Sequence, residues 1–170
     1  MKIIFVTGNK IKYSIAKNIL NSYGIDIVQE NMKTPEIQAE DGKEICEYSA
    51  KYAFDKLKKP LVKTDVSYHI HSLNGFPGPF IKYINNWLTP EDLLNLMRDR
   101  EDRTIEIREY LTYISSDGKI KTFQTSSLCK LSDKIYSEKG YMIDKLLIRP
   151  GLEIPQNILS EKELEELFSK

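Results

Sequence analysis

The sequence predicts an α/β fold that opens with two parallel strands joined by a helix. Residues 3–7 form an apolar run of strand length. Isoleucines then recur every fourth residue over 11–19, which is typical of one face of an amphipathic helix. Gly24 ends this unit, and residues 25–28 predict a second strand. A strand–helix–strand order favours parallel pairing within one sheet.

The later segments continue the alternation of helices and strands. Apolar residues at helical spacing over 43–58 predict a second helix that ends before Pro60. The strongest loop signal is Asn74–Pro79, which is rich in glycine and proline. We expect the other elements to be strands at 61–66 and 68–70, a helix within 80–87, a helix with Thr89 as N-cap, a hairpin with arms 103–115 and 119–125, and a final helix at 161–168 after Ser160.

Length and composition place the chain among single-domain globular proteins. It has 170 residues, 41% of them hydrophobic, and no segment has the composition of a linker, so we expect one domain over residues 1–170. The 25 basic residues equal the 25 acidic residues, which argues against a protein that coats nucleic acid or an anionic membrane. No apolar run approaches the roughly 20 residues that span a bilayer, and the N-terminal run is too short for a signal peptide. We therefore expect a cytoplasmic protein without a membrane segment.

The junction of the first strand and the first helix is a candidate phosphate site. Its sequence is Thr7-Gly8-Asn9-Lys10-Ile11-Lys12. Free backbone N–H groups at a helix start, a glycine that permits close approach and one or two lysines suit an anionic ligand. From spacing alone, an ordinary turn with surface lysines explains the segment equally well.

Two carboxylates are candidates for metal binding. Glu36 lies in a loop after the second strand, and Asp65 lies within the apolar strand 61–66. A buried carboxylate without a partner costs several kcal/mol, so Asp65 needs a nearby cation or an opening to water. Two carboxylates together with substrate phosphates can hold Mg²⁺, and one of them can take a proton from an attacking water.

Two further segments carry weaker signals. The loop at 75–82 combines a rigid turn with Phe80 and Lys82, which can stack on a base and meet a phosphate, or simply form a structural turn. His69 and His71 are expected on one strand face, where solvent exposure explains them better than half a metal site. The two cysteines are too few for a disulfide framework or a zinc knuckle.

Taken in order, these segments resemble the inosine/xanthosine triphosphate pyrophosphatase family, the Ham1-like enzymes. The signature Thr-Gly-Asn-x-x-Lys is present at residues 7–12, and Pro-Glu-x-Gln is present at residues 35–38. Asp65 is followed by Leu-x-Gly-x-Pro-Gly-x-x-x-Lys at residues 73–82. The match runs from residue 3 to about residue 125, and the motifs are specific only in combination.

The resemblance implies an elongated, two-lobed α/β fold with a central mixed sheet flanked by helices, in a protein that forms a homodimer. It implies Mg²⁺-dependent hydrolysis of ITP, XTP or dITP to the monophosphate and pyrophosphate. Asp65 would help to activate water and, with Glu36, hold the metal, while Lys12 and Lys82 would neutralise charge that develops on the phosphates. The substrate contacts implied for this chain are Thr7, Gly8, Asn9, Lys12, Phe80, Lys82, Asp144 and Ser160.

The chain also departs from the family pattern. Ile15 and Thr64 stand where the family usually has acids, and Ile15 fits the apolar stripe, so we expect it to pack in the core. Glu161 and Lys162 replace a His-Arg pair that helps to read the purine, which removes the planar fork of arginine. Two alternatives follow. The protein binds a nucleotide or a protein partner without turnover, or Glu161 accepts hydrogen bonds from an exocyclic amine of another modified nucleotide.

Overall fold

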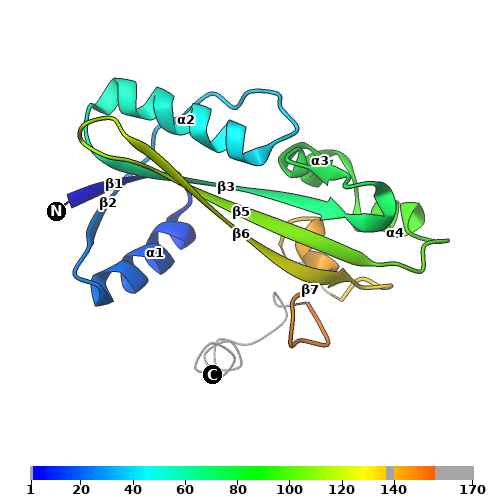
Figure 1. Cartoon of the computed structure of the whole chain (residues 1–170). Coiled ribbons are helices and arrows are strands. Elements are labelled where there is room, and N and C mark those ends of the chain that lie inside the picture. Colours follow the sequence, from blue (N-terminus) through cyan, green and yellow to red (C-terminus); the bar gives the residue numbers. More distant parts are fainter. Residues whose placement is uncertain (1, 137–139, 156–170) are drawn as a thin grey trace. The chain divides into compact units, whose positions relative to one another are not determined.

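The computed structural model describes residues 2–136 and 140–155, which form two compact units. Unit 1 comprises the described residues up to Val66 together with Glu109–Thr125, and unit 2 comprises Ser67–Arg108 and the described residues from Ser126 onward. Three long strands contribute to both units (Figure 1): β3 (Leu61–Ile70), β5 (Thr104–Ile114) and β6 (Ile120–Leu131).

The strands form one mixed sheet with the order β2-β1-β3-β5-β6-β7, and β4 pairs with β3. The β1–β2 and β1–β3 pairs are parallel, whereas the β3–β4 and β6–β7 pairs are antiparallel. The predicted α/β class with a mixed central sheet flanked by helices is therefore confirmed. Among the described residues, no helix is both long enough and apolar enough to cross a membrane.

Unit 1 opens with the predicted strand–helix–strand sequence, β1 (Lys2–Val6), α1 (Lys10–Ser22) and β2 (Asp26–Glu30). The β1–β2 ladder runs in parallel over the whole length of both strands. The β1–β3 ladder contains only the pairs Ile4↔Leu61 and Phe5↔Val62. It therefore ends before β3 reaches Asp65.

The second helix of unit 1, α2 (Gly42–Leu57), lies close to its predicted bounds. It begins after Asp41, whose side chain accepts a hydrogen bond from the Lys43 backbone N–H at 2.8 Å. It ends at Lys58, which adopts the left-handed conformation as C-cap. The N-cap and the left-handed C-cap satisfy backbone groups that a helix end leaves without partners.

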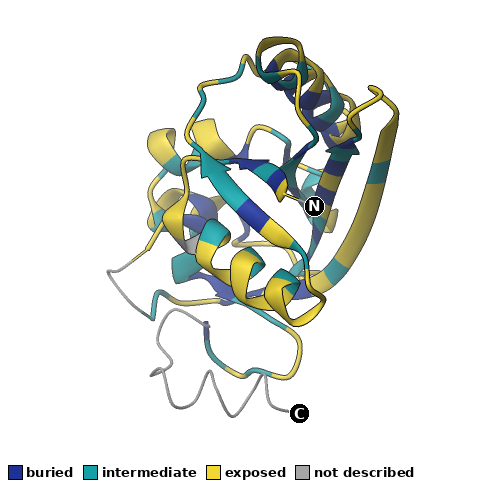
Figure 2. Cartoon of the chain, turned by 90° about the vertical axis from the view of Figure 1, so that its left-hand side faces the viewer, coloured by how far each residue is buried: buried dark blue, intermediate teal, exposed yellow. Residues whose placement is uncertain are grey.

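The two helices cover opposite faces of the sheet in unit 1 (Figure 1). Ala50 and Ala53 of α2 are fully buried against Leu61 and Ile114. On the other face, α1 contributes only partly buried side chains to the cluster around Phe5, and most of its surface is exposed (Figure 2). Unit 1 thus has one tightly covered sheet face and one loosely covered face.

The sequence predicts the wrong buried face for α1. Tyr13, Ala16 and Leu20 face the sheet, whereas Ile15 and Ile19 are 56% and 55% exposed. The Tyr13 hydroxyl donates a hydrogen bond to the Ile27 carbonyl at 3.2 Å, which fixes the rotation of the helix about its axis. A four-residue repeat does not distinguish between these adjacent helical faces, because each turn contains 3.6 residues.

Unit 2 contains the helices predicted after the glycine-rich loop, together with short elements that the sequence did not predict. Thr89 caps the helix that begins at Pro90, as the sequence predicts, and forms a capping box with Asp92. The elements are a 3₁₀ turn at His71–Leu73, β4 (Pro77–Gly78), α3 (Ile81–Trp87), α4 (Pro90–Leu96), a second 3₁₀ turn at Ile143–Lys145, and β7 (Leu147–Ile148).

Several expected boundaries change in the structure. The two strands expected at 61–66 and 68–70 are one continuous strand, β3, and the second hairpin arm extends to Leu131 as β6. His69 and His71 do not share a strand face, because β3 ends at Ile70 and His71 starts a 3₁₀ turn. The final helix expected at 161–168 lies outside the described residues.

Arg103 ties together three backbone segments of unit 2. Its guanidinium donates hydrogen bonds to the carbonyls of Leu131, Met97 and Ser132. All three of these acceptor residues are buried. The fixed fork of five N–H donors allows one side chain to satisfy several carbonyls that water does not reach.

We expect Arg103→Ala to lower the free energy of unfolding by about 2–4 kcal/mol, because it removes three hydrogen bonds to the carbonyls of buried residues. Arg103→Lys should recover only part of this loss, since an ammonium lacks the planar fork. Urea denaturation monitored by circular dichroism measures both effects. Arg100→Ala, at an exposed position nearby, is the control and should change the free energy by less than about 0.5 kcal/mol; an equally small change in Arg103→Ala would contradict the prediction.

Candidate active site

The predicted phosphate site forms the turn between β1 and α1. Asn9 acts as the helix cap, since its side-chain oxygen accepts a hydrogen bond from the Lys12 backbone N–H at 3.1 Å. The Thr7 hydroxyl accepts one from the Asn9 backbone N–H, also at 3.1 Å. Gln29 on β2 holds the Thr7 carbonyl from its side-chain amide at 3.0 Å. The turn is thus held by its own side chains, while Gly8, Asn9 and Lys12 are exposed.

Gly8 lies close to the side chain of Asn31 at this turn. A Cβ atom at this position would lie 2.7 Å from the side-chain oxygen of Asn31, which follows β2. This distance is shorter than a normal contact, so a side chain at position 8 would displace Asn31 or the turn. The glycine therefore keeps the turn close to the segment after β2.

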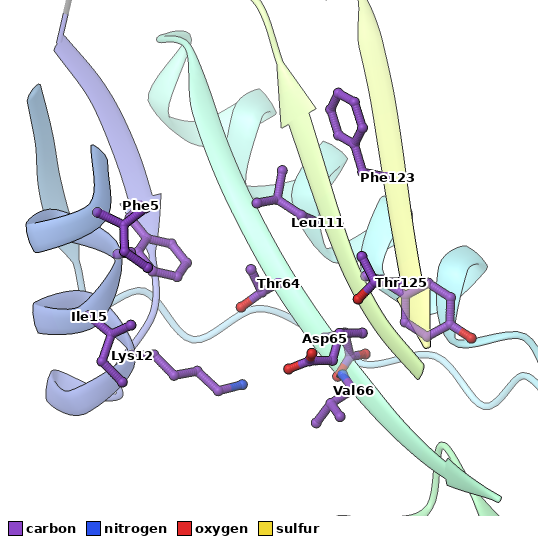
Figure 3. A pocket seen from close by; sticks show the side chains of 13 residues that line it. Phe5, Lys12, Ile15, Thr64, Asp65, Val66, Leu111, Phe123 and Thr125 are labelled. Carbon is purple, nitrogen blue, oxygen red and sulfur yellow. The ribbon is translucent and has the colours of Figure 1, made fainter. Parts of the chain in front are cut away.

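A pocket of about 490 Å³ in unit 1 brings Lys12 and Asp65 to one site. Lys12 enters it from α1 and Asp65 enters it from β3. Figure 3 shows the Lys12 side chain extending across the opening toward the Asp65 carboxylate. The sequence predicts both residues as functional, and the structure places both in the lining of this pocket.

Burial raises the pKa of Asp65 above its ordinary value. A hydrogen bond of 2.8 Å from the Val66 backbone N–H to the carboxylate acts in the opposite direction. The negative charge of Glu36 raises the pKa further, and the positive charges of Lys12 and Lys63 lower it. The net upward shift makes the ionised carboxylate a stronger base than an exposed aspartate.

Glu36 belongs to the same charged cluster, although it lies outside the pocket lining. It is exposed in the segment between β2 and α2, and its charge acts on both Asp65 and Lys63. The segment is anchored by the Ser49 hydroxyl of α2, which donates a hydrogen bond to the Pro35 carbonyl at 2.8 Å. This contact places Glu36 beside the face of α2 that lies on the sheet.

Lys63 is a member of this cluster that the sequence analysis missed. It lies two residues before Asp65 on β3, so both side chains leave the same face of the strand. Burial lowers the Lys63 pKa, whereas the nearby charges of Asp65, Cys46 and Glu36 raise it. The sequence did offer a signal for Lys63: it is a lysine within an apolar strand, two residues before the candidate aspartate.

The remainder of the pocket wall is apolar. Ile15 and Ile19 of α1 face it from one side, and Leu111 of β5 and Phe123 of β6 face it from the other. The expectation that Ile15 packs in the core is therefore wrong, because α1 is rotated so that this position opens onto the pocket. Thr64, the other position where the family usually has an acid, also lines it.

The remaining predicted site residues belong to unit 2 or lie outside the described residues. Phe80 and Lys82 are exposed at the start of α3, and the Lys82 ammonium lies 6.0 Å from the centre of the Tyr83 ring. Burial raises the pKa of Asp144, whose carboxylate accepts a hydrogen bond from the Tyr141 backbone N–H at 3.2 Å. Ser160 lies outside the described residues.

The chemistry of the donors fits a hard divalent cation. Glu36 and Asp65 supply carboxylate oxygens, and the described part of the chain contains no group of three or more His, Cys, Asp or Glu residues placed to hold a metal ion. Carboxylate oxygens are the protein ligands that Mg²⁺ takes, usually one or two of them, while it retains waters and binds phosphate oxygens.

Comparison with known proteins agrees with the resemblance seen in the motifs. The sequence model of the Ham1 family matches residues 3–166. The chain belongs to the Ham1 family. It is 33% identical over 151 residues to the dITP/XTP pyrophosphatase of Methanopyrus kandleri, covering 89% of this chain and 80% of the relative. It is 31% identical over 166 residues to the dITP/XTP pyrophosphatase of Pyrococcus horikoshii, covering 98% and 87% respectively.

Solved Ham1 structures share the fold. A HAM1 protein from Coxiella burnetii superposes with a TM-score of 0.80 over 99% of this chain and 97% of that chain, at 16% sequence identity. At this identity the likeness establishes the fold alone. Within this Ham1 fold, the first turn of α1 and the middle of β3 carry Lys12 and Asp65 to the pocket.

We expect Ile15→Glu to change the free energy of unfolding by less than about 0.5 kcal/mol, because Ile15 is 56% exposed and faces the pocket. Leu20→Glu, on the face of α1 that packs against the sheet, should cost several kcal/mol because it places a charge among apolar side chains. Thermal denaturation of the two variants makes the comparison. Equal losses would mean that Ile15 contributes to the core.

Asp65→Asn should stabilise the protein at neutral pH. The native pKa of Asp65 is raised, so the folded state binds this proton more tightly than the unfolded state does. Ionisation of Asp65 therefore costs stability as pH rises from its unfolded pKa through its folded pKa, and the cost remains at higher pH. The denaturation midpoint of Asp65→Asn should be higher than that of the wild type at pH 7, and the two midpoints should converge at acid pH. Asp55→Asn, at an exposed position on α2, is the matched control.

Proposed function

We propose that this Ham1-family protein is a nucleoside triphosphate pyrophosphohydrolase that converts ITP, XTP or dITP to the monophosphate and pyrophosphate. The observation that carries this proposal is the approach of Lys12 and Asp65 from two elements into one pocket, with Glu36 in the same charged cluster. The dITP/XTP pyrophosphatases of Methanopyrus kandleri and Pyrococcus horikoshii, which align over most of the chain, support the substrate class.

The β1–α1 turn is suited to bind the phosphates. It offers the exposed start of a 13-residue helix, whose first turn contains no acidic residue. Gly8 presents backbone without a side chain, and Lys12 adds a positive charge that reaches into the pocket. Charge that develops on the leaving pyrophosphate would meet Lys12.

Glu36 and Asp65 are the residues that would hold Mg²⁺. When bound, the ion would supply positive charge to the phosphate oxygens. The two carboxylates act on each other electrostatically and repel, and a cation between the carboxylates would relieve that repulsion. Thr64 and Ile15 supply no carboxylate, so the protein's own share of the ligands would be small.

Asp65 is the proton acceptor in this proposal. A water molecule attacks the α-phosphorus, the bond from this phosphorus to the bridging oxygen breaks, and pyrophosphate leaves with that oxygen. The proton of the attacking water passes to the Asp65 carboxylate. The raised pKa of Asp65 favours this transfer, because a more basic carboxylate retains the proton better.

The proposal includes features drawn from the family resemblance. Lys82 would contact phosphate, and Phe80, Asp144 and Ser160 would contact other parts of the substrate. The protein would act as a homodimer in the cytoplasm. Cross-linking or sedimentation of the purified chain measures the dimer directly.

We expect the protein with Mg²⁺ to release pyrophosphate from ITP, XTP or dITP faster than from GTP or ATP. Asp65→Asn should lower kcat by about 10²–10⁴-fold, because it removes the general base. Lys12→Met should lower kcat/KM by about 10-fold or more, because it removes a charged contact to phosphate. A coupled pyrophosphate assay, with chromatography of the nucleotides, measures both products.

Asp55→Asn is the control for the loss of a carboxylate and should retain wild-type turnover, since Asp55 is exposed on α2. Folding of each variant is checked by circular dichroism. Turnover that survives in Asp65→Asn would remove Asp65 from the mechanism. A folded wild-type protein that binds these nucleotides with Mg²⁺ but does not hydrolyse them would overturn the proposed activity.

A further inference from the structure

One face of α2 brings Lys63 next to Glu36. Cys46 and Ser49 lie one turn apart on this helix, so they share a face. The Cys46 thiol contacts the Lys63 carbonyl at 3.5 Å, and the Ser49 hydroxyl donates to the Pro35 carbonyl at 2.8 Å. The same helical face therefore holds the strand that carries Lys63 and the loop that carries Glu36.

The charges of this cluster show how Lys63 differs from a surface lysine. Its side chain is half-buried on β3, and the strand directs it to the same side as Asp65. Asp65 and Glu36 attract its ammonium, while Lys12 repels it. Lys63 is therefore a half-buried positive charge close enough to Asp65 and Glu36 to act on both carboxylates of the candidate metal site.

We propose that Lys63 is a built-in cation of the active site: it weakens the hold of Glu36 and Asp65 on a divalent ion and offers its ammonium to the substrate phosphates. The inference rests on the proposed function, which places the phosphates between Lys12 and Asp65. The chain lacks acids at positions 15 and 64, where the family usually has them. In a site with fewer carboxylates and an added lysine, more of the positive charge that faces the phosphates comes from side chains and less comes from a bound metal ion.

This role predicts opposite effects on two ligands when the charge of Lys63 is removed. A divalent cation should bind more tightly, because it no longer meets a like charge beside the carboxylates. A phosphate anion should bind more weakly, because it loses an ionic contact. A purely structural lysine would behave differently, since damage to the site would weaken the binding of both ligands.

The experiment titrates the full-length protein with Mn²⁺, followed by electron paramagnetic resonance, and with inorganic pyrophosphate in the presence of EDTA, followed by calorimetry. In Lys63→Gln, the Kd for Mn²⁺ should fall on the order of tenfold. The Kd for pyrophosphate should rise about tenfold or more. Lys63→Arg keeps the charge and should stay near the wild-type values for both ligands.

Lys59→Gln is the matched control, because it removes a lysine charge from an exposed position in unit 1. It should leave both dissociation constants unchanged. If Lys63→Gln weakens both ligands or changes neither, the inference is wrong. It is also wrong if the wild-type protein binds neither probe. Opposite shifts in a protein that hydrolyses no triphosphate would sustain the role of Lys63 and refute the proposed hydrolysis, so the two failures are distinguishable.

Discussion

The central constraint on unit 1 is that β3, a partly buried strand, carries charged side chains. Lys63 and Asp65 lie on the same face of β3, and burial shifts both pKa values toward the neutral forms. Taking charges out of water is unfavourable unless opposite charges and hydrogen bonds compensate. The backbone N–H of Val66, the charge of Lys12 and the mutual attraction of Lys63 and Asp65 supply that compensation. The arrangement of the site follows from these few contacts.

The position of β3 depends in turn on how α2 packs. Polar groups beneath this helix find partners in one another: buried Thr112 donates to the sulfur of buried Cys46 at 3.3 Å, and partly buried Thr122 donates to the Glu47 carboxylate at 2.7 Å. Ala50 and Ala53 bring the helix backbone close to the sheet. Satisfied polar contacts inside an apolar interface favour one register of the helix, because any other leaves buried groups unpaired. The tightly packed face of the sheet thus fixes the strand whose charges open onto the pocket.

The opposite face of the sheet is only loosely covered by α1. The two positions that depart from the expected family pattern, 15 and 64, line the pocket on this side. Ile15 lines the pocket and is largely exposed, so its side chain shapes the pocket wall and adds little to the core. Thr64 lines the same pocket. The pocket wall near Asp65 therefore holds the positive charge of Lys12 and no carboxylate at positions 15 and 64. Lys63, the residue before Thr64 on β3, acts on Asp65 from its own side of the strand.

Local patterns in the sequence determined the order of the main helices and strands, the Thr89 cap, the membership of the Ham1 family and the candidate pair Lys12 and Asp65, because each depends on neighbouring residues or on a contiguous motif. Only the tertiary structure decided which face of α1 is buried and that Lys63 joins the carboxylates. The rotation of α1 is set by the hydrogen bond from Tyr13 to Ile27, fourteen residues away. The placement of Lys63 depends on α2, whose residues Cys46 and Ser49 contact two separate segments. Helical periodicity specifies a repeat but not the partner of each face, since packing energy arises between segments that are distant in the chain.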